Sequence, residues 1–240
     1  MNLFDATIAR ITTRGLFGRR RFLLLLPLPM LLVGLALLAD GFGARPADWA
    51  QPVLVGLGFA AVLPVISLIV GTGVLGSEID DGTLVHVLAK PLPRRQIIVT
   101  KLAVAVAVTA VTVGVPMFVA GLIAGSARLG AGLAAGCVVG AFAYSALFLA
   151  LSLLTRRPVL LGLLYVLIWE GMLGNLLSGT RVLSIQQYVT AVAVRVGDTD
   201  LLAGRVSVPV AVVMAVVFTL GGTLLAIDRL RSFSVAGETS

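Results

Sequence analysis

The residues best suited to chemistry gather in one polar segment, residues 77–101, which lies between two long apolar runs. Its first part holds three acidic residues, Glu78, Asp80 and Asp81. Clustered carboxylates are the kind of ligand that Mg²⁺ takes, yet this spacing matches no metal-binding motif. The chain has a single histidine, His86, which cannot supply a two-histidine metal site. We therefore predict no metal site and no catalytic residue in this segment.

A second candidate is Glu170, which stands in the middle of another apolar run and is followed by Asn175. A carboxylate at the centre of a bilayer costs roughly 3 kcal/mol or more, so it needs a polar environment. Two roles are open for it. Glu170 and Asn175 line a substrate route, or Glu170 forms a hydrogen bond with a neighbouring helix.

Several enzyme classes lack their motifs in this sequence. No G-x4-G-K-[ST] pattern is present, so the chain is not predicted to be an ATPase itself. No H-E-x-x-H pattern is present, and the single cysteine excludes a disulfide framework. We expect a protein that is not an enzyme and that binds no cofactor of its own.

Composition indicates the scaffold that must position these residues. The 240 residues are 59% hydrophobic and only 12% charged, about half the charged fraction of a soluble domain. Apolar runs near 20 residues recur, which predicts an all-α integral membrane protein with one transmembrane domain, residues 1–240. Six spans are predicted, at about residues 22–39, 52–76, 98–124, 131–154, 159–177 and 206–227.

The basic residues indicate orientation. The net charge is +7, but most lysines and arginines lie at span ends, on the side of the termini. This bias places both termini and the polar segment on the cytoplasmic side of a cell membrane. Membrane orientation thus accounts for the positive charge, and nucleic-acid binding is not needed to explain it. Residues 1–21 are basic and amphipathic, which favours a helix in contact with membrane lipids over a loosely ordered tail.

The polar segment itself predicts a short helix. Gly82 permits a turn, Thr83 can cap a helix, and Leu84 and Leu88 share one face before Pro91 ends it. An exposed apolar face on a short cytoplasmic helix favours a binding partner that covers it.

These residues resemble a known pattern. Glu78, Gly82-Thr83-Leu84, Leu88, Pro91, Arg94 and Lys101 are similar to the E-x3-GTL-x3-L-x2-P-x2-R-x6-K pattern of the ATP-binding-cassette type-2 permeases. The resemblance implies that Gly82 to Ala89 is a coupling helix, with Glu78 and Arg94 as flanking anchors. It also implies a homodimer, or a heterodimer with a homologous permease, that exports a substrate. A separate nucleotide-binding subunit would bind ATP and Mg²⁺.

Two other function classes are weaker interpretations. One is a membrane-embedded enzyme acting on a lipid-like substrate, with Glu170 or the acidic cluster as its chemistry. The other is a purely structural membrane subunit. A partner ATPase would favour the transporter over both.

A second amphipathic pattern lies between Ser178 and Arg205, before the sixth span. Gln186, Gln187, Thr190 and Arg195 lie on the face opposite its apolar residues, and the helix is expected to lie at, or dip into, the outer leaflet. Ser184 with Gln187 predicts a capping box at the start of this extracellular helix. In the fourth span, glycines recur at residues 132, 136 and 140, which favours close helix packing within one chain over a subunit interface.

Overall fold

The computed structural model describes residues 5–17, 25–80, 93–173 and 182–235, and every regular element in them is helical. The predicted all-α class is therefore confirmed. In chain order the elements are α1 (Ala6–Phe17), α2 (Pro27–Gly41), α3 (Pro46–Ala50), η2 (Gln51–Val62), α4 (Leu63–Asp80), α6 (Arg94–Ile123), α7 (Ala127–Leu154), α8 (Pro158–Leu164), η3 (Tyr165–Leu173), α10 (Ile185–Gly197) and α11 (Val208–Val235).

Four helices in the described residues are long and apolar enough to cross a membrane. They are Pro46–Leu75, Arg94–Ile123, Ala127–Leu154 and Val208–Leu230, and they match the second, third, fourth and sixth predicted spans. The first of them is continuous through α3, η2 and α4. The chain is a multi-pass membrane protein.

The first and fifth predicted spans correspond to shorter apolar helices, Pro27–Gly41 and Pro158–Met172. A helix of 15 residues such as α2 rises about 22 Å, which is less than the roughly 30 Å of a bilayer core. Of the remaining residues, 22–24 and 174–177 lie outside the described part of the chain, while Leu25 and Leu26 form a bend before α2. Six spans are thus a prediction, of which four are present at full length.

Prolines determine where several helices begin. Pro27, Pro46 and Pro158 stand in the first turns of α2, α3 and α8, where a missing N–H costs no hydrogen bond. Ser126 caps α7, because its side-chain oxygen accepts a hydrogen bond of 3.0 Å from the amide of Leu129. The fourth span therefore begins at Ala127, four residues before the predicted boundary.

The helices around the polar segment extend further into it than the sequence predicted. α4 continues to Asp80, so Glu78 lies in its last turn, whereas the second span was expected to end at 76. α6 begins at Arg94 rather than near residue 98. The reason is that polar residues are compatible with a helix once it has left the apolar layer, so hydropathy alone underestimates helix length.

Two stretches are π-helical, η2 and η3. η2 ends at Val62, two residues before Pro64, which lacks an N–H and cannot continue a regular hydrogen-bond ladder. A wider turn in front of a proline gives its ring room and redistributes the freed carbonyls. Pro116, by contrast, lies inside the uninterrupted helix α6.

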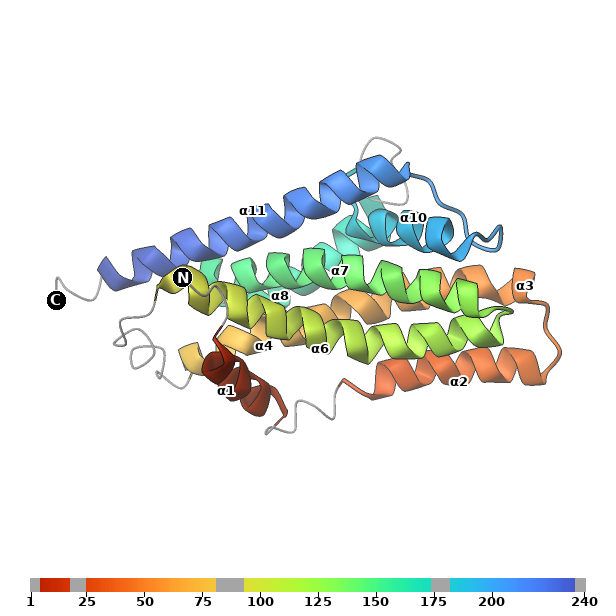
Figure 1. Ribbon diagram of the computed structural model, residues 1–240, viewed down its shortest axis with the longest axis horizontal. Helices are drawn as coiled ribbons and strands as arrows, with labels where there is room; N and C mark the ends of the chain where they lie inside the picture. The colour runs from red at the N-terminus through yellow and green to blue at the C-terminus, as the bar shows by residue number, and fades with distance from the viewer. Residues whose placement is uncertain (1–4, 18–24, 81–92, 174–181, 236–240) are drawn as a thin grey trace.

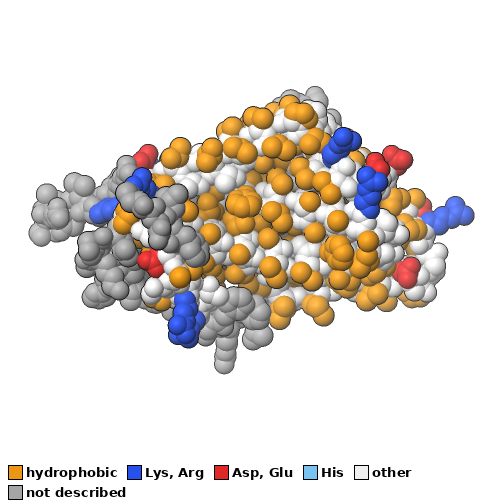
Figure 2. All heavy atoms as spheres, in the orientation of Figure 1, with side chains coloured by type: hydrophobic (Ala, Val, Ile, Leu, Met, Phe, Trp, Pro, Cys, Tyr) orange, Lys and Arg blue, Asp and Glu red, His pale blue; other side chains and the backbone are white. Residues whose placement is uncertain are grey.

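α7 forms the centre of the bundle and packs against α4, α6, α10 and α11 (Figure 1). In the most apolar 18-residue stretch of α7, 67% is buried inside the protein, against 17% in the corresponding stretch of α11. Figure 2 shows a broad hydrophobic belt, with charged side chains gathered toward the two ends of the molecule. This distribution is what a bilayer requires: apolar side chains face the lipid tails, and ions lie at the headgroups.

The bundle has two ends, which we name by their amphipathic helices. The α1 end holds α1, the last turns of α4, the start of α6 and the end of α11. The α10 end holds α3, the turn between α6 and α7, and the C-terminal part of α10. At the α10 end, Asp198 adopts a left-handed conformation (φ 48°) that terminates α10, and its carboxylate pairs with Arg128 at 2.8 Å.

Candidate functional site

Most of the predicted coupling segment lies outside the described residues. This applies to Gly82, Thr83, Leu84, Leu88 and Pro91, and also to Asn175 in the other candidate site. What the structure describes is the pair of helices that lead into and out of the segment, α4 and α6, which pack against each other.

Arg94 is the first residue of α6, and its guanidinium has a specific protein contact. Its Nη1 donates a hydrogen bond of 2.8 Å to the backbone carbonyl of Leu230 in α11. The family resemblance implied a flanking anchor at Arg94, and this nitrogen binds a backbone carbonyl of α11. A hydrogen bond from a charged guanidinium to a carbonyl is stronger than one between neutral groups. Arg94 therefore fixes the start of α6 to α11.

Lys101 is a buried residue whose position the sequence did not reveal. Its side chain is 1% exposed, and Nζ donates a hydrogen bond of 2.7 Å to the carbonyl of Val74 in α4. The neighbouring Thr100 accepts a bond of 3.2 Å from the backbone amide of Asp5, just before α1. One turn of α6 thus connects α1 and α4 at the α1 end. A lysine inside an apolar run is the signal that the sequence offers for this position.

Glu170 is fully enclosed, with 0% of its surface exposed. Its carboxylate accepts hydrogen bonds from the Tyr165 hydroxyl at 3.1 Å and from the Ile185 amide at 2.8 Å. The hydroxyl of Ser184 and the amide of Gln186 also donate to it. An anion at this place is favourable because the first amides of α10 have no partner within the helix.

The predicted capping box at the start of α10 is wrong. Ser184 is the N-cap residue, but its side chain makes no capping bond to the helix and donates to Glu170 instead. The carboxylate, 14 residues earlier in the chain, binds the amides that a local cap would bind. The sequence left two roles open for Glu170. These contacts match the second role, a hydrogen bond with a neighbouring helix.

The segment before α10 has two further connections. The indole nitrogen of Trp169 donates to the carbonyl of Leu183 at 3.2 Å. The hydroxyl of Tyr188 donates to the carbonyl of Val182. Together with Glu170, these bonds hold the N-terminal end of α10 against η3.

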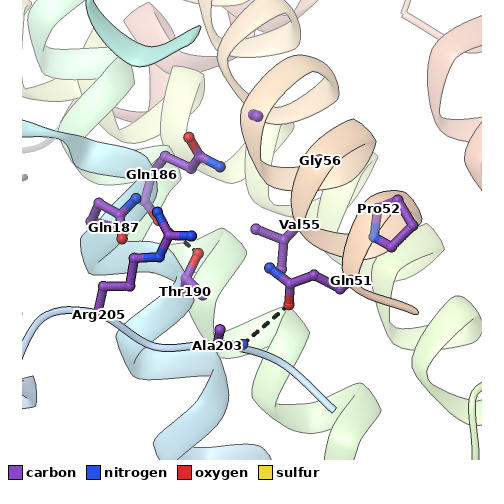
Figure 3. Close-up of a pocket in the computed structure, with 10 residues that line it drawn as sticks. Gln51, Pro52, Val55, Gly56, Gln186, Gln187, Thr190, Ala203 and Arg205 are labelled. Carbon is purple, nitrogen blue, oxygen red and sulfur yellow. Dashed lines mark hydrogen bonds between the residues drawn. The ribbon is translucent and has the colours of Figure 1, made fainter. Parts of the chain in front are cut away.

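Three polar residues of α10 that the sequence placed opposite its apolar face are buried inside the protein. Gln186, Gln187 and Thr190 are only 4%, 5% and 2% exposed. They face a pocket of about 250 Å³ that lies between α10, η2 and the connection leading to α11 (Figure 3). The helical period was predicted correctly. Its polar face turned inward because η2 and Arg205 provide a polar surface there.

The glycine stripe of α7 explains how closely α10 approaches. A Cβ atom at Gly132 would stand 2.4 Å from the carbonyl oxygen of Ala193, and one at Gly136 would stand 2.8 Å from that of Val189. These contacts confirm the predicted packing within one chain. Backbone meets backbone here, so any side chain would force α10 away from α7.

No group of three or more histidine, cysteine, aspartate or glutamate residues stands close enough to hold a metal ion in the part of the chain that the structure describes. Glu170 is surrounded by hydroxyl and amide donors, which are suited to holding a carboxylate in place. The described geometry is that of a membrane scaffold with a polar pocket at one end.

Residues 19–185 match the model of a family described as ABC-2 family transporter protein. The chain belongs to this family. The match includes the polar segment and its two flanking helices, and it ends at the first residue of α10. A search of curated proteins found no match. As an ABC-2 membrane component, the protein works with ATP-binding subunits, and the family resemblance stated from the GTL pattern is confirmed.

Proposed function

We propose that this ABC-2 protein is the permease subunit of an ATP-driven exporter, and that residues 82–89 are the helix that receives the force of ATP hydrolysis. The family match over residues 19–185 carries the proposal, because this range includes the whole E-x3-GTL-x3-L-x2-P-x2-R-x6-K pattern. ATP and Mg²⁺ are bound by the partner subunit, and this chain converts its closure into helix motion.

The contacts at the α1 end supply a path for that motion. Residues 82–89 lie between α4 and α6, and the bond from Lys101 to Val74 joins those two helices. α6 in turn packs along α7 at the centre of the bundle. A push on the connecting segment therefore reaches α4 and α6 together, rather than bending one helix alone.

In this proposal both termini are cytoplasmic, six spans cross the cell membrane, and α10 lies on the outer side. Two copies, or one copy and a homologous permease, pair with two ATPase subunits, and the substrate passes along their interface. Glu170 contributes by holding α10 in place. The positive-inside distribution of lysine and arginine supports this orientation.

The test introduces charge into the proposed docking face. We expect Leu84→Glu with Leu88→Glu to abolish co-purification with the ATPase subunit and transport-coupled ATP hydrolysis, because a buried unpaired charge is costly at an interface. Gly82→Pro should uncouple transport by disturbing the start of the helix. Membrane insertion, checked by size-exclusion chromatography of the solubilised protein, should be unchanged.

The matched control is Leu84→Met with Leu88→Met, which keeps the face apolar and should retain both ATPase binding and transport. If the glutamate variant binds the ATPase subunit and transports as the methionine variant does, residues 82–89 are not the coupling helix. Catalytic turnover of a lipid by the purified chain without an ATPase would favour the membrane-enzyme interpretation.

A further inference from the structure

The pocket at the α10 end has a polar lining that membrane packing does not require. η2 contributes Gln51, α10 contributes Gln186, Gln187 and Thr190, and the connection to α11 contributes Arg205. Its volume of about 250 Å³ is several times that of a water molecule, whose share of liquid volume is about 30 Å³. We call it the Arg205 pocket. It has room for a small polar group rather than for a single water.

The charge of the Arg205 pocket favours an anion. Among the described residues that line it, Arg205 is the only charged one, and none is a carboxylate. Asp198, at the C-terminal end of α10, is paired with Arg128 at 2.8 Å. A guanidinium offers a planar fork of donors that suits phosphate or carboxylate oxygens.

The amide of Gln51 adds a second donor, and its orientation is fixed. Its Oε1 accepts a hydrogen bond of 3.1 Å from the backbone amide of Ala203, so its Nε2 is left to donate elsewhere. Figure 3 shows this nitrogen on the side of the pocket that faces Arg205. Gln51 and Arg205 thus both offer donors to the pocket.

Acceptors stand on the opposite wall. The hydroxyl of Thr190 donates its proton to the carbonyl of Gln186 at 2.9 Å, which leaves its oxygen lone pairs as acceptors. The side chain of Gln186 extends toward η2. Its Oε1 is buried and has no hydrogen-bond partner in the described residues. Leaving such an oxygen unpaired is unfavourable, so a hydroxyl group that reaches it and donates a hydrogen bond would be stabilising.

The pocket lies at the depth of lipid headgroups. Gln51 is five residues into the span that starts at Pro46, and Arg205 is three residues before the span that starts at Val208. Both positions are at the end of an apolar helix, at the level where a spanning helix leaves the lipid tails and enters the headgroup layer. The lining therefore combines anion donors with hydroxyl acceptors at the membrane boundary.

We propose that the Arg205 pocket binds a phosphate ester that carries free hydroxyl groups, such as a phosphoglycerol group. The phosphate lies against Arg205 and Gln51, and the hydroxyl groups donate to Thr190 and Gln186. The phosphoglycerol group belongs either to the headgroup of a lipid or to a soluble glycerol phosphate. This inference goes beyond the proposed function, because binding requires no ATPase subunit.

The test measures binding to the purified full-length protein in a neutral detergent by titration calorimetry. The probes are dihexanoyl phosphatidylglycerol, dihexanoyl phosphatidylcholine and sn-glycerol 3-phosphate. We expect phosphatidylglycerol to bind at least about tenfold more tightly than phosphatidylcholine, which has no free hydroxyl groups. Binding of the lipid alone identifies a headgroup site. Comparable binding of glycerol 3-phosphate shows that the shared phosphoglycerol group is enough.

Two variants test the wall contacts. Arg205→Gln should weaken phosphatidylglycerol binding by about 10- to 100-fold, through loss of a charge-assisted bond, and Thr190→Val by about tenfold or less. The matched control is Arg195→Gln, since Arg195 is an exposed arginine of α10 that does not line the pocket. Equal weakening by Arg195→Gln and Arg205→Gln would show only general attraction of anions and would overturn the proposal. Equal binding of the two lipids, or binding of none of the probes, would also overturn it.

Discussion

α1 and α10 are both amphipathic helices outside the long spans, at opposite ends of the bundle, yet their environments differ. In α10, the nine residues from Ile185 to Ala193 are all buried. In α1, Thr12 is buried but Ile11, an apolar residue, is 59% exposed. Two similar amphipathic patterns have thus produced one helix that is inserted into the bundle and one that lies on its surface.

The difference comes from the partners and not from the helices themselves. α10 meets the glycine stripe of α7, which removes side chains from the contact, and the Glu170 carboxylate binds its first amides. α1 meets the bundle through the Asp5–Thr100 bond and a contact between Leu16 and the position of Gly73. An amphipathic helix is inserted only where the neighbouring surface can satisfy both of its faces.

The strongest test of this comparison removes the space for α10. Gly132→Val would place carbon atoms on the backbone of Ala193 and Gly197, at distances of 2.4 and 2.5 Å for Cβ alone. Backbone cannot move aside as a side chain can, so α10 must separate from α7. We expect a loss of about 3 kcal/mol, seen as a fall of roughly 6–12 °C in the Tm of the detergent-solubilised protein.

The control for this variant is Gly221→Val on α11, where a Cβ atom would meet nothing within 4 Å. Its Tm should stay close to that of the unaltered protein. If both valine variants unfold at the same temperature, the close approach of α7 and α10 does not determine the position of α10.

A smaller effect is expected at the other attachment of α10. Glu170→Gln preserves the shape of the side chain but replaces one acceptor oxygen with an NH2 group. The hydrogens of this group would face the hydroxyl and amide donors that now bind the carboxylate. We expect a cost of about 1–3 kcal/mol, with faster hydrogen exchange in the first turn of α10. Asp40→Asn, at an exposed position near the end of α2, should change neither property. Unchanged exchange at residues 185–189 would contradict the role of Glu170 as an anchor.

The sequence predicted the features that depend on local pattern. Long apolar runs predicted the four long spans, and a proline, Pro158, stands at the start of α8, one residue before the predicted fifth span. The period of α10 was also predicted correctly. Hydrophobicity and proline geometry act over a few residues, so they can be read without knowing the fold.

The features that depend on distant partners could not be predicted. Lys101 is buried because the carbonyl of Val74 is available on another helix. The polar face of α10 turns inward because Gln51, more than 130 residues earlier, forms the opposite wall of the pocket. The sequence indicated that Glu170 needed a polar partner, but not that the partner would be the start of α10. The coupling segment is the reverse case: its motif is visible in the sequence, while residues 82–89 lie outside the described structure.

The smallest expected effect is at α1. Asp5 caps this helix, because its Oδ1 accepts hydrogen bonds from the amides of Thr7 at 2.8 Å and Ile8 at 3.2 Å. Asp5→Ala should cost about 1 kcal/mol, with faster hydrogen exchange over residues 6–10 and no change in α10. Thr7→Ala is the matched control, because it keeps the backbone amide that Asp5 binds. A surface helix with few attachments should respond locally to the loss of its cap. Faster exchange in α10 as well would show that the two ends are coupled, and that α1 is as firmly integrated into the bundle as α10.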